Sequence, residues 1–239
     1  MVDYETMKQL YYFALKSIFL FFLLSLLGAF LAPKKEPFTP LSSRSMSLET
    51  RQYDRFVNGV FKDNILLNAA YLQGTAKKGE KVNWDEVRKP RKYEFKLEPG
   101  ASFAFHDDID PKYAQTVVKT TNAHFNAQEG FKSDGYLMGD GVCHFASLFY
   151  WAAKDAGLAT NQPVNHSFAV IPEFPREYGV SIYNTPENKA VGQAQNLYIT
   201  NNKAEPIVFS VTYDGEKLTI AVLEAKKEPS NVTMLSYQK

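Results

Sequence analysis

The segment Gly139-Asp140-Gly141-Val142-Cys143-His144-Phe145, continuing to Ala156-Gly157-Leu158, predicts the buried helix around which the fold is organised. The first two glycines permit the positive φ angles of a tight turn. Asp140 is a candidate N-cap, because its carboxylate can accept hydrogen bonds from the amides of the first turn. Gly157 offers the position at which helices commonly end. Apolar residues recur at steps of three and four and widen to most of the circumference, which predicts burial on most sides. They are Val142, Phe145, Leu148, Phe149, Trp151, Ala152 and Ala156.

Cys143, the only cysteine of the chain, falls in the first turn of this helix. Unpaired amides and the helix dipole favour an anion there, which predicts a lowered thiol pKa. A thiolate is a nucleophile for acyl transfer if a base lies nearby. The alternative is that Cys143 acts as a small buried hydrophobe, as lone cysteines often do. Spacing alone favours this second interpretation.

Composition limits the possible function classes. The 239 residues carry 27 Lys and Arg against 26 Asp and Glu, a net charge of +1. No basic stripe is present, so we expect no nucleic-acid partner. A single cysteine excludes a framework of intrachain disulfides.

A zinc site would have to combine Cys143, His144 and His166 with His106 or His124. Adjacent cysteine and histidine side chains seldom reach one tetrahedral ion, and the sequence has no paired Cys-x-x-Cys or His-x-x-x-His motif. We therefore expect neither a metal nor a cofactor.

Residues 10–32 form an apolar run that lacks charge from Ser17 onward. Its 23 residues are long enough to cross a bilayer core of about 30 Å. A cleaved signal peptide is the alternative, but no small-x-small cleavage motif precedes Pro33. Residues 1–33 are predicted to be an uncleaved, single-pass membrane anchor.

Three further segments follow the anchor. Residues 34–47 are rich in Pro, Ser and charge and read as a linker. Residues 48–90 read as a helical preface and a loop, with a helix from Leu48 to Leu72 capped by Ser47 and stopped at Gly74. Residues 226–239 read as a C-terminal tail.

From Arg91 the hydrophobic period changes to two, which is typical of strands. The predicted strands are 93–97, 102–105, 166–171, 178–183, 196–200, 207–213 and 217–223, the last two joined by an Asp214-Gly215 turn. Residues 113–125 read either as a helix or as irregular structure. The expected fold is α+β, with a central buried helix carrying the cysteine, packed on a mostly antiparallel sheet and preceded by the transmembrane helix.

Several motifs in a shared order resemble the VanW-like family of extracytoplasmic bacterial domains, over about residues 93–223. They are Pro99-Gly100-Ala101-Ser102-Phe103-Ala104-Phe105, Gly139-Asp140-Gly141-Val142-Cys143, Ala156-Gly157-Leu158, His166-Ser167 and Asn201 through Pro206-Ile207. Residues 91–225 are accordingly assigned to a VanW-like domain. Two departures stand out: His144 replaces the family's usual glutamine, and Tyr178 occupies the position of an acidic residue.

A cysteine at a helix start followed by a strand histidine is the layout of several thiol enzymes. It predicts Cys143 as nucleophile and His166 as base, with Glu177 or Asn201 (or Asn202) orienting the histidine. Backbone amides at Cys143 or His144 would stabilise an oxyanion. The predicted substrate contacts are Gly139, Asp140, Gly141, His144 and Ser167.

The resemblance implies a cell-envelope location and a site, but not a substrate. The leading hypothesis is a membrane-anchored envelope protein in which Cys143 and His166 carry out thiol acyl transfer, as a hydrolase or transpeptidase, on peptidoglycan stem peptides or a similar envelope peptide. The positive-inside rule disagrees, because more Lys and Arg follow the apolar run than precede it. A protein of this family is expected outside the cytoplasm, and we follow that expectation. The alternative function is a non-catalytic envelope-binding or scaffolding module, in which the helix predicted at 48–72 is a docking surface.

Overall fold

The computed structural model describes residue 16, residues 37–184 and residues 188–226. The chain divides into a unit of residues 1–37 and a unit of residues 38–239, and the second contains the fold described here. The predicted membrane segment, residues 10–32, lies outside the described residues apart from Lys16. In the described part of the chain, no helix combines the length and the apolar character needed to span a membrane.

The first sheet has the strand order β1-β8-β7-β2 and is antiparallel throughout. Its strands are β1 (Phe38–Ser47), β8 (Lys217–Ala225), β7 (Ile207–Tyr213) and β2 (Arg91–Leu97). The linker predicted at 34–47 is therefore wrong from Phe38 onward. This serine-rich segment lacks apolar alternation, and it forms a strand because its main chain pairs with the edge of β8.

The second sheet has the order β4-β3-β6-β5, and only the β3–β4 pairing is parallel. Its short strands are β4 (Val117–Lys119), β3 (Ser102–Ala104), β6 (Tyr198–Thr200) and β5 (Ala159–Asn161). The strands predicted at 166–171 and 178–183 are wrong, because these segments are irregular apart from the 3-10 helix η3 (Arg176–Tyr178). They contact each other through isolated backbone bonds, such as His166 N–H to Gly179 O at 3.2 Å.

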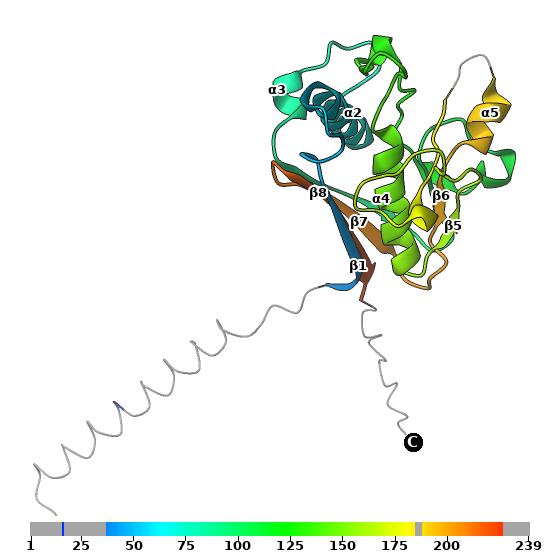
Figure 1. The fold of residues 1–239 in the computed structure, drawn as a ribbon. Helices are drawn as coiled ribbons and strands as arrows, with labels where there is room; N and C mark the ends of the chain where they lie inside the picture. Colours follow the sequence, from blue (N-terminus) through cyan, green and yellow to red (C-terminus); the bar gives the residue numbers. More distant parts are fainter. Residues whose placement is uncertain (1–15, 17–36, 185–187, 227–239) are drawn as a thin grey trace, which may run out of the picture. The chain divides into compact units, whose positions relative to one another are not determined.

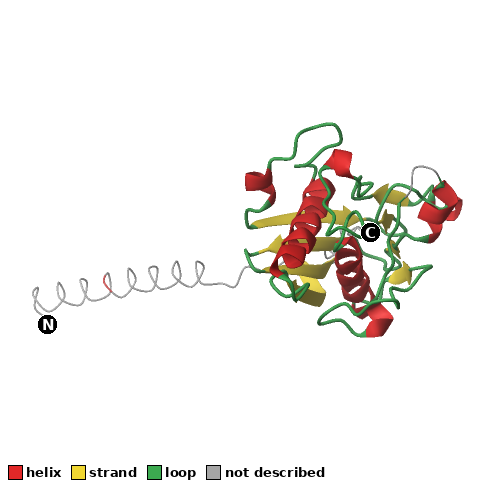
Figure 2. Ribbon diagram, turned by 45° about the horizontal axis from the view of Figure 1, so that its top comes forward, coloured by secondary structure: helices red, strands yellow, loops and turns green. Residues whose placement is uncertain are grey.

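Helix α2 (Arg55–Gln73) ends where predicted, at Gly74 with φ +85°, but it begins seven residues later than predicted. Asp54 is its N-cap and accepts hydrogen bonds from the amides of Phe56 and Val57. The helix is not a separate preface to the domain. It packs against the first sheet and against helix α4 (Figure 2), so β1 and α2 share one compact unit with the residues after 91.

Helix α4 (Val142–Asp155) is the predicted cysteine helix, and it ends at Gly157 with φ +69° as predicted. The predicted N-cap is wrong. Gly141 occupies the cap position with φ +93°, and no side chain caps the helix. The Asp140 carboxylate instead accepts the Asp134 amide at 3.1 Å.

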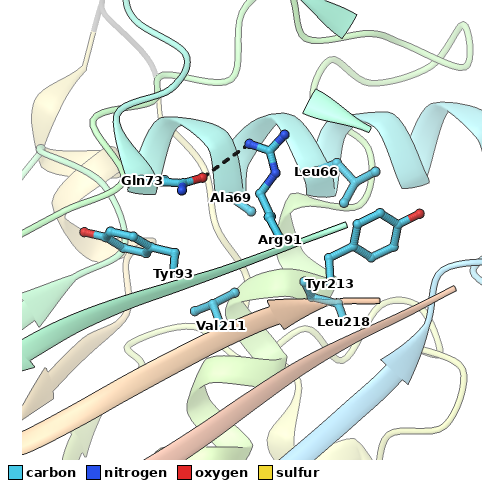
Figure 3. Close-up of a pocket in the computed structure, with 8 residues that line it drawn as sticks. All are labelled: Leu66, Ala69, Gln73, Arg91, Tyr93, Val211, Tyr213 and Leu218. Carbon is cyan, nitrogen blue, oxygen red and sulfur yellow. Dashed lines mark hydrogen bonds between the residues drawn. The ribbon is translucent and has the colours of Figure 1, made fainter. Parts of the chain in front are cut away.

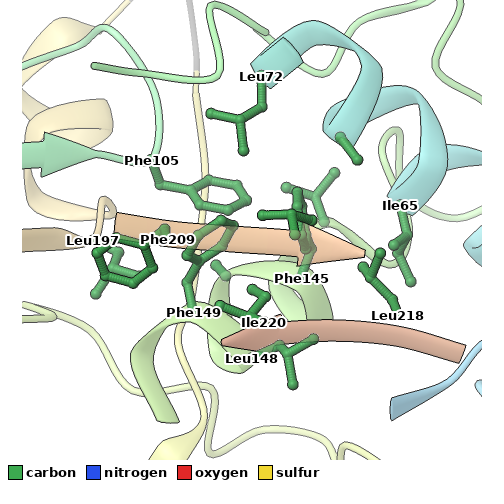
Figure 4. Close-up of a cluster of buried hydrophobic side chains, with 14 of the residues drawn as sticks. Ile65, Leu72, Phe105, Phe145, Leu148, Phe149, Leu197, Phe209, Leu218 and Ile220 are labelled. Carbon is green, nitrogen blue, oxygen red and sulfur yellow. The ribbon is translucent and has the colours of Figure 1, made fainter. Parts of the chain in front are cut away.

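The core lies between the two long helices and the strands (Figure 4). Phe149 of α4 is fully buried and packs on the rings of Phe95, Phe103 and Phe209 at centroid distances of 6.2, 5.1 and 5.8 Å. The architecture is thus a mixed α+β fold with few helices. The remaining short elements are α3 (Trp84–Val87), α5 (Lys189–Ala194), η1 (Pro111–Tyr113) and η2 (Ala127–Glu129) (Figure 1).

A small gap remains between α2 and the first sheet (Figure 3). Its volume is about 10 Å³, which holds no more than one water molecule. Arg91 closes one side by donating to Gln73 at 3.3 Å. This gap is a packing defect and has no room for a ligand.

Candidate functional site

The Cys143 side chain is tied to the backbone of a distant segment. Its Sγ accepts a hydrogen bond from the Ile182 amide at 3.4 Å and lies 3.6 Å from the Ile182 carbonyl, to which the thiol donates. These two bonds join the first turn of α4 to the irregular segment that follows η3. They use the thiol as a donor and as an acceptor at once.

Burial, together with the nearby charge of Asp140, raises the pKa of the Cys143 thiol to about 11. The hydrogen bond from the Ile182 amide favours the thiolate but does not offset the loss of hydration. The lowered pKa predicted from the helix start is therefore wrong. At pH 7 the Cys143 thiol is therefore protonated.

His166 is buried close to the start of α4, and its Nδ1 lies 3.2 Å from the carbonyl of Ala169. The ring packs against that of Phe168 at a centroid distance of 4.0 Å, with the two planes tilted by 44°. Within the described residues, no hydrogen bond joins the Cys143 thiol to His166, because the thiol is bonded to Ile182. Burial lowers the pKa of His166. The structure brings the predicted nucleophile and base into one region without pairing them.

His144 follows Cys143 in the chain, and its ring lies near that of His166. Its ring lies 5.1 Å from that of Phe61 and 6.3 Å from that of His166, with only 3% of the residue exposed. Burial, together with the charges of Arg51 and His166, lowers the pKa of His144 to about 3. Its Nδ1 has no hydrogen-bond partner among the described residues. His144 is thus a neutral ring packed in the interior.

The proposed orienting residues do not contact His166. Glu177 is exposed on η3, and no hydrogen bond joins it to His166 within residues 37–184. Asn201 is fully buried, and its amide donates to the carbonyls of Leu97 and Glu205, both at 3.0 Å. Its Oδ1 accepts the Lys203 amide at 2.9 Å, so every polar atom of this side chain stabilises the turn after β6.

The predicted substrate contacts have structural partners of their own. A Cβ at Gly141 would lie 2.8 Å from the Phe61 carbonyl oxygen, and one at Gly139 would lie 3.0 Å from the Phe125 Cβ. Both glycines therefore allow close packing of the chain on its neighbours. Burial, together with the charge of Asp134, raises the pKa of Asp140 to about 6. Ser167 is exposed, and its carbonyl accepts a bond from Arg176 at 3.4 Å.

Arg51 is a polar residue of this region that sequence reasoning missed. It is fully buried, pairs with Glu173 at 2.6 Å and donates to the Pro172 carbonyl at 3.1 Å. The sequence places it in an ordinary polar stretch, and only the fold brings residues 51 and 173 together. Arg51 ties the loop between β1 and α2 to the loop before η3.

In the ranges that the structure describes, no three His, Cys, Asp or Glu side chains are placed to hold a metal ion. His124, considered above as a zinc ligand, is bound by carboxylates. Its Nδ1 lies 2.6 Å from buried Glu129, and its Nε2 lies 3.0 Å from Asp107. The hydrogen bonds that His124 donates to Asp107 and Glu129 raise its pKa to about 10.

Comparison with known proteins returns one match. A family model described as "VanW like protein" matches residues 91–223, which is more than half of the chain. No curated protein and no solved structure matches the chain. The matched region runs from the start of β2 into β8 and contains α4 with Cys143. The chain belongs to the VanW-like protein family.

Proposed function

We propose that this protein is a non-catalytic binding or scaffolding module of the bacterial cell envelope. The supporting observation is the state of Cys143. Its thiol is protonated and bonded to the Ile182 backbone in both directions, and the Nδ1 of His166 faces the Ala169 carbonyl. A thiol enzyme requires the reverse, a base that is hydrogen-bonded to an activated sulfur.

The proposal includes an envelope location. The uncharged run from Ser17 to Ala32 anchors the chain in the membrane, and membership of the family favours a domain outside the cytoplasm. An envelope peptide, such as a peptidoglycan stem peptide, is the ligand class that this location makes available.

A second candidate function is thiol acyl transfer on such a peptide. It is favoured by the contact of His166 with His144, the residue next to Cys143. His166 would take the thiol proton, the sulfur would attack a peptide carbonyl, and the leaving amine would receive that proton. Water or a second amine would then release the acyl group. This reaction requires the Ile182 bonds to open first.

The pH dependence of Cys143 alkylation by iodoacetamide separates the two functions. The full chain in detergent is compared with His166→Ala and with Phe168→Ala, a matched change in the same loop that removes no titrating group. We expect slow alkylation that rises towards pH 11 in all three proteins. A profile centred below the free-thiol value of about 8.5, shifted by His166→Ala alone, would establish the enzyme and exclude the binding module.

A further inference from the structure

A groove of about 730 Å³ runs along the first half of α2, on the side of α3 and the segment before α4. This volume is in the range of sites that bind small ligands and short peptides. None of the residues discussed above around Cys143 lines it. The lining residues are Arg55, Phe56, Gly59, Val60, Lys62, Asp63, Arg88, Lys132 and Ser133.

The groove carries a net positive charge, with four cationic side chains against a single carboxylate in its lining. That carboxylate, Asp63, is bound by Arg88 through Nε and Nη2 at 2.9 and 2.7 Å and is also bound by Lys132. Burial would raise the pKa of Asp63, but its hydrogen bonds with Arg88 and Lys132 bring it below the ordinary value. Asp63 stays ionised and fixes two cations in place at the groove.

Trp84 of α3 holds the same two cations from the other side. The Arg88 guanidinium lies 5.1 Å and the Lys132 ammonium 4.3 Å from the centroid of the Trp84 ring. Arg55, by contrast, forms no ion pair or hydrogen bond with any described side chain. The fourth cation, Lys62, is paired with Glu49. The groove thus combines two pre-positioned cations and one paired lysine with Arg55, which is exposed and has no partner among the described side chains.

The groove also has an apolar part. Phe56 is 70% exposed at its end, whereas Val60, one turn further along the helix, is only 5% exposed and lies at the floor of the groove. Gly59 lies between them, and a Cβ added there would meet no atom within 4 Å. A helix-interior glycine costs about 1 kcal/mol relative to alanine, and no described neighbour packs closely enough to require one here. The helix surface is therefore open to an approaching chain.

We propose that this groove binds a short acidic peptide that carries an apolar side chain. The cations pair with its carboxylates, Phe56 contacts its apolar group, and its backbone lies over Gly59. Polyphosphate or a purely charged polymer would use the cations and leave the apolar part unfilled. The inference rests on the proposed binding role and assigns it a surface.

Fluorescence anisotropy tests the inference with a fluorescein-labelled octapeptide of four glutamates, one leucine and three serines, titrated with the full chain in detergent. One comparison peptide has glutamine for glutamate, and another has serine for leucine. We expect the glutamine peptide to bind at least 10-fold more weakly and the leucine-free peptide about 3-fold more weakly. Affinity should fall as salt is raised, because the ion pairs are solvent-exposed.

Variants localise the binding. Arg55→Glu reverses the unpaired cation, and Gly59→Leu fills the groove while improving the helix propensity of α2. Each should weaken binding at least 10-fold. Lys154→Glu reverses an exposed cation near the end of α4 and should leave the Kd within 2-fold. Thermal unfolding of Gly59→Leu confirms that the variant is folded.

The inference is overturned if both glutamine and glutamate peptides bind alike, or if Arg55→Glu and Gly59→Leu leave the Kd unchanged. It is also overturned if Lys154→Glu weakens binding as much as Arg55→Glu, or if inorganic polyphosphate binds more tightly than the peptide. Cys143→Ser should not change the Kd. The anisotropy titration thus measures groove binding, and the alkylation profile measures thiol reactivity independently of it. Either proposal can fail without the other.

Discussion

A helix start lowers a thiol pKa only where the sulfur contacts the unpaired amides and stays hydrated. In α4 the sulfur of Cys143 contacts the backbone of Ile182 instead, and burial dominates its pKa. The same balance applies to His144 and His166, whose pKa values are both lowered by burial. The position of Cys143 at a helix start predicts a thiolate, but burial in the folded chain keeps the thiol protonated.

His124 shows the opposite balance, and its contribution to stability depends on pH. Its pKa is about 10 in the folded chain and 6.5 in an unpaired histidine. Because the folded value is raised, the contribution is complete below pH 6.5 and is lost as the pH rises from 6.5 through 10. We expect His124→Gln to cost about 2 kcal/mol at pH 6.

Urea unfolding of both proteins between pH 6 and pH 10 measures this effect. The difference in the free energy of unfolding should shrink steadily over that interval. A difference that stays constant with pH would show that Asp107 and Glu129 do not stabilise a charged His124.

At the scale of single elements, Gly59 and Gly141 have opposite effects on the stability of their surroundings. Gly141 has φ +93° and lies against the backbone of Phe61, whereas Gly59 is in the interior of α2 with open space beside it. Gly141→Ala should destabilise the protein by about 2–3 kcal/mol, through an unfavourable φ and a close contact.

Gly59→Ala is the matched substitution, and we expect it to stabilise the protein by about 1 kcal/mol because alanine is the better helix former. Thermal unfolding of the two variants beside the parent chain measures both changes. Equal destabilisation by the two substitutions would show that the helix surface at Gly59 is covered.

At the scale of the whole molecule, the family-matched segment 91–223 is only part of the compact unit. Removing the residues before 91 deletes β1, which pairs with β8, and α2, whose Ile65, Leu67 and Leu72 are buried. We expect a chain that begins at residue 91 to lack a cooperative thermal transition and to give poorly dispersed NMR spectra.

A chain of residues 38–226 is the matched control, and it should unfold cooperatively. A well-dispersed spectrum from the chain that begins at residue 91 would show that the second sheet and α4 fold without α2.

The sequence by itself determined the elements that local patterns specify. Helix α4 and its end at Gly157, the end of α2 at Gly74, and strands β2, β7 and β8 all follow from hydrophobic period and turn chemistry. The family assignment was also within its reach, because the motifs occur in order along the chain.

Only the tertiary structure decided the rest. Strand β1 depends on an edge supplied by β8, and the segments 166–171 and 178–183 remain irregular although their composition favours strands. The state of Cys143 depends on Ile182, and the basic groove joins α2 to residues 88 and 132. The physical reason is the same throughout: desolvation, main-chain pairing and ion pairs are set by neighbours distant in sequence, which no local pattern records.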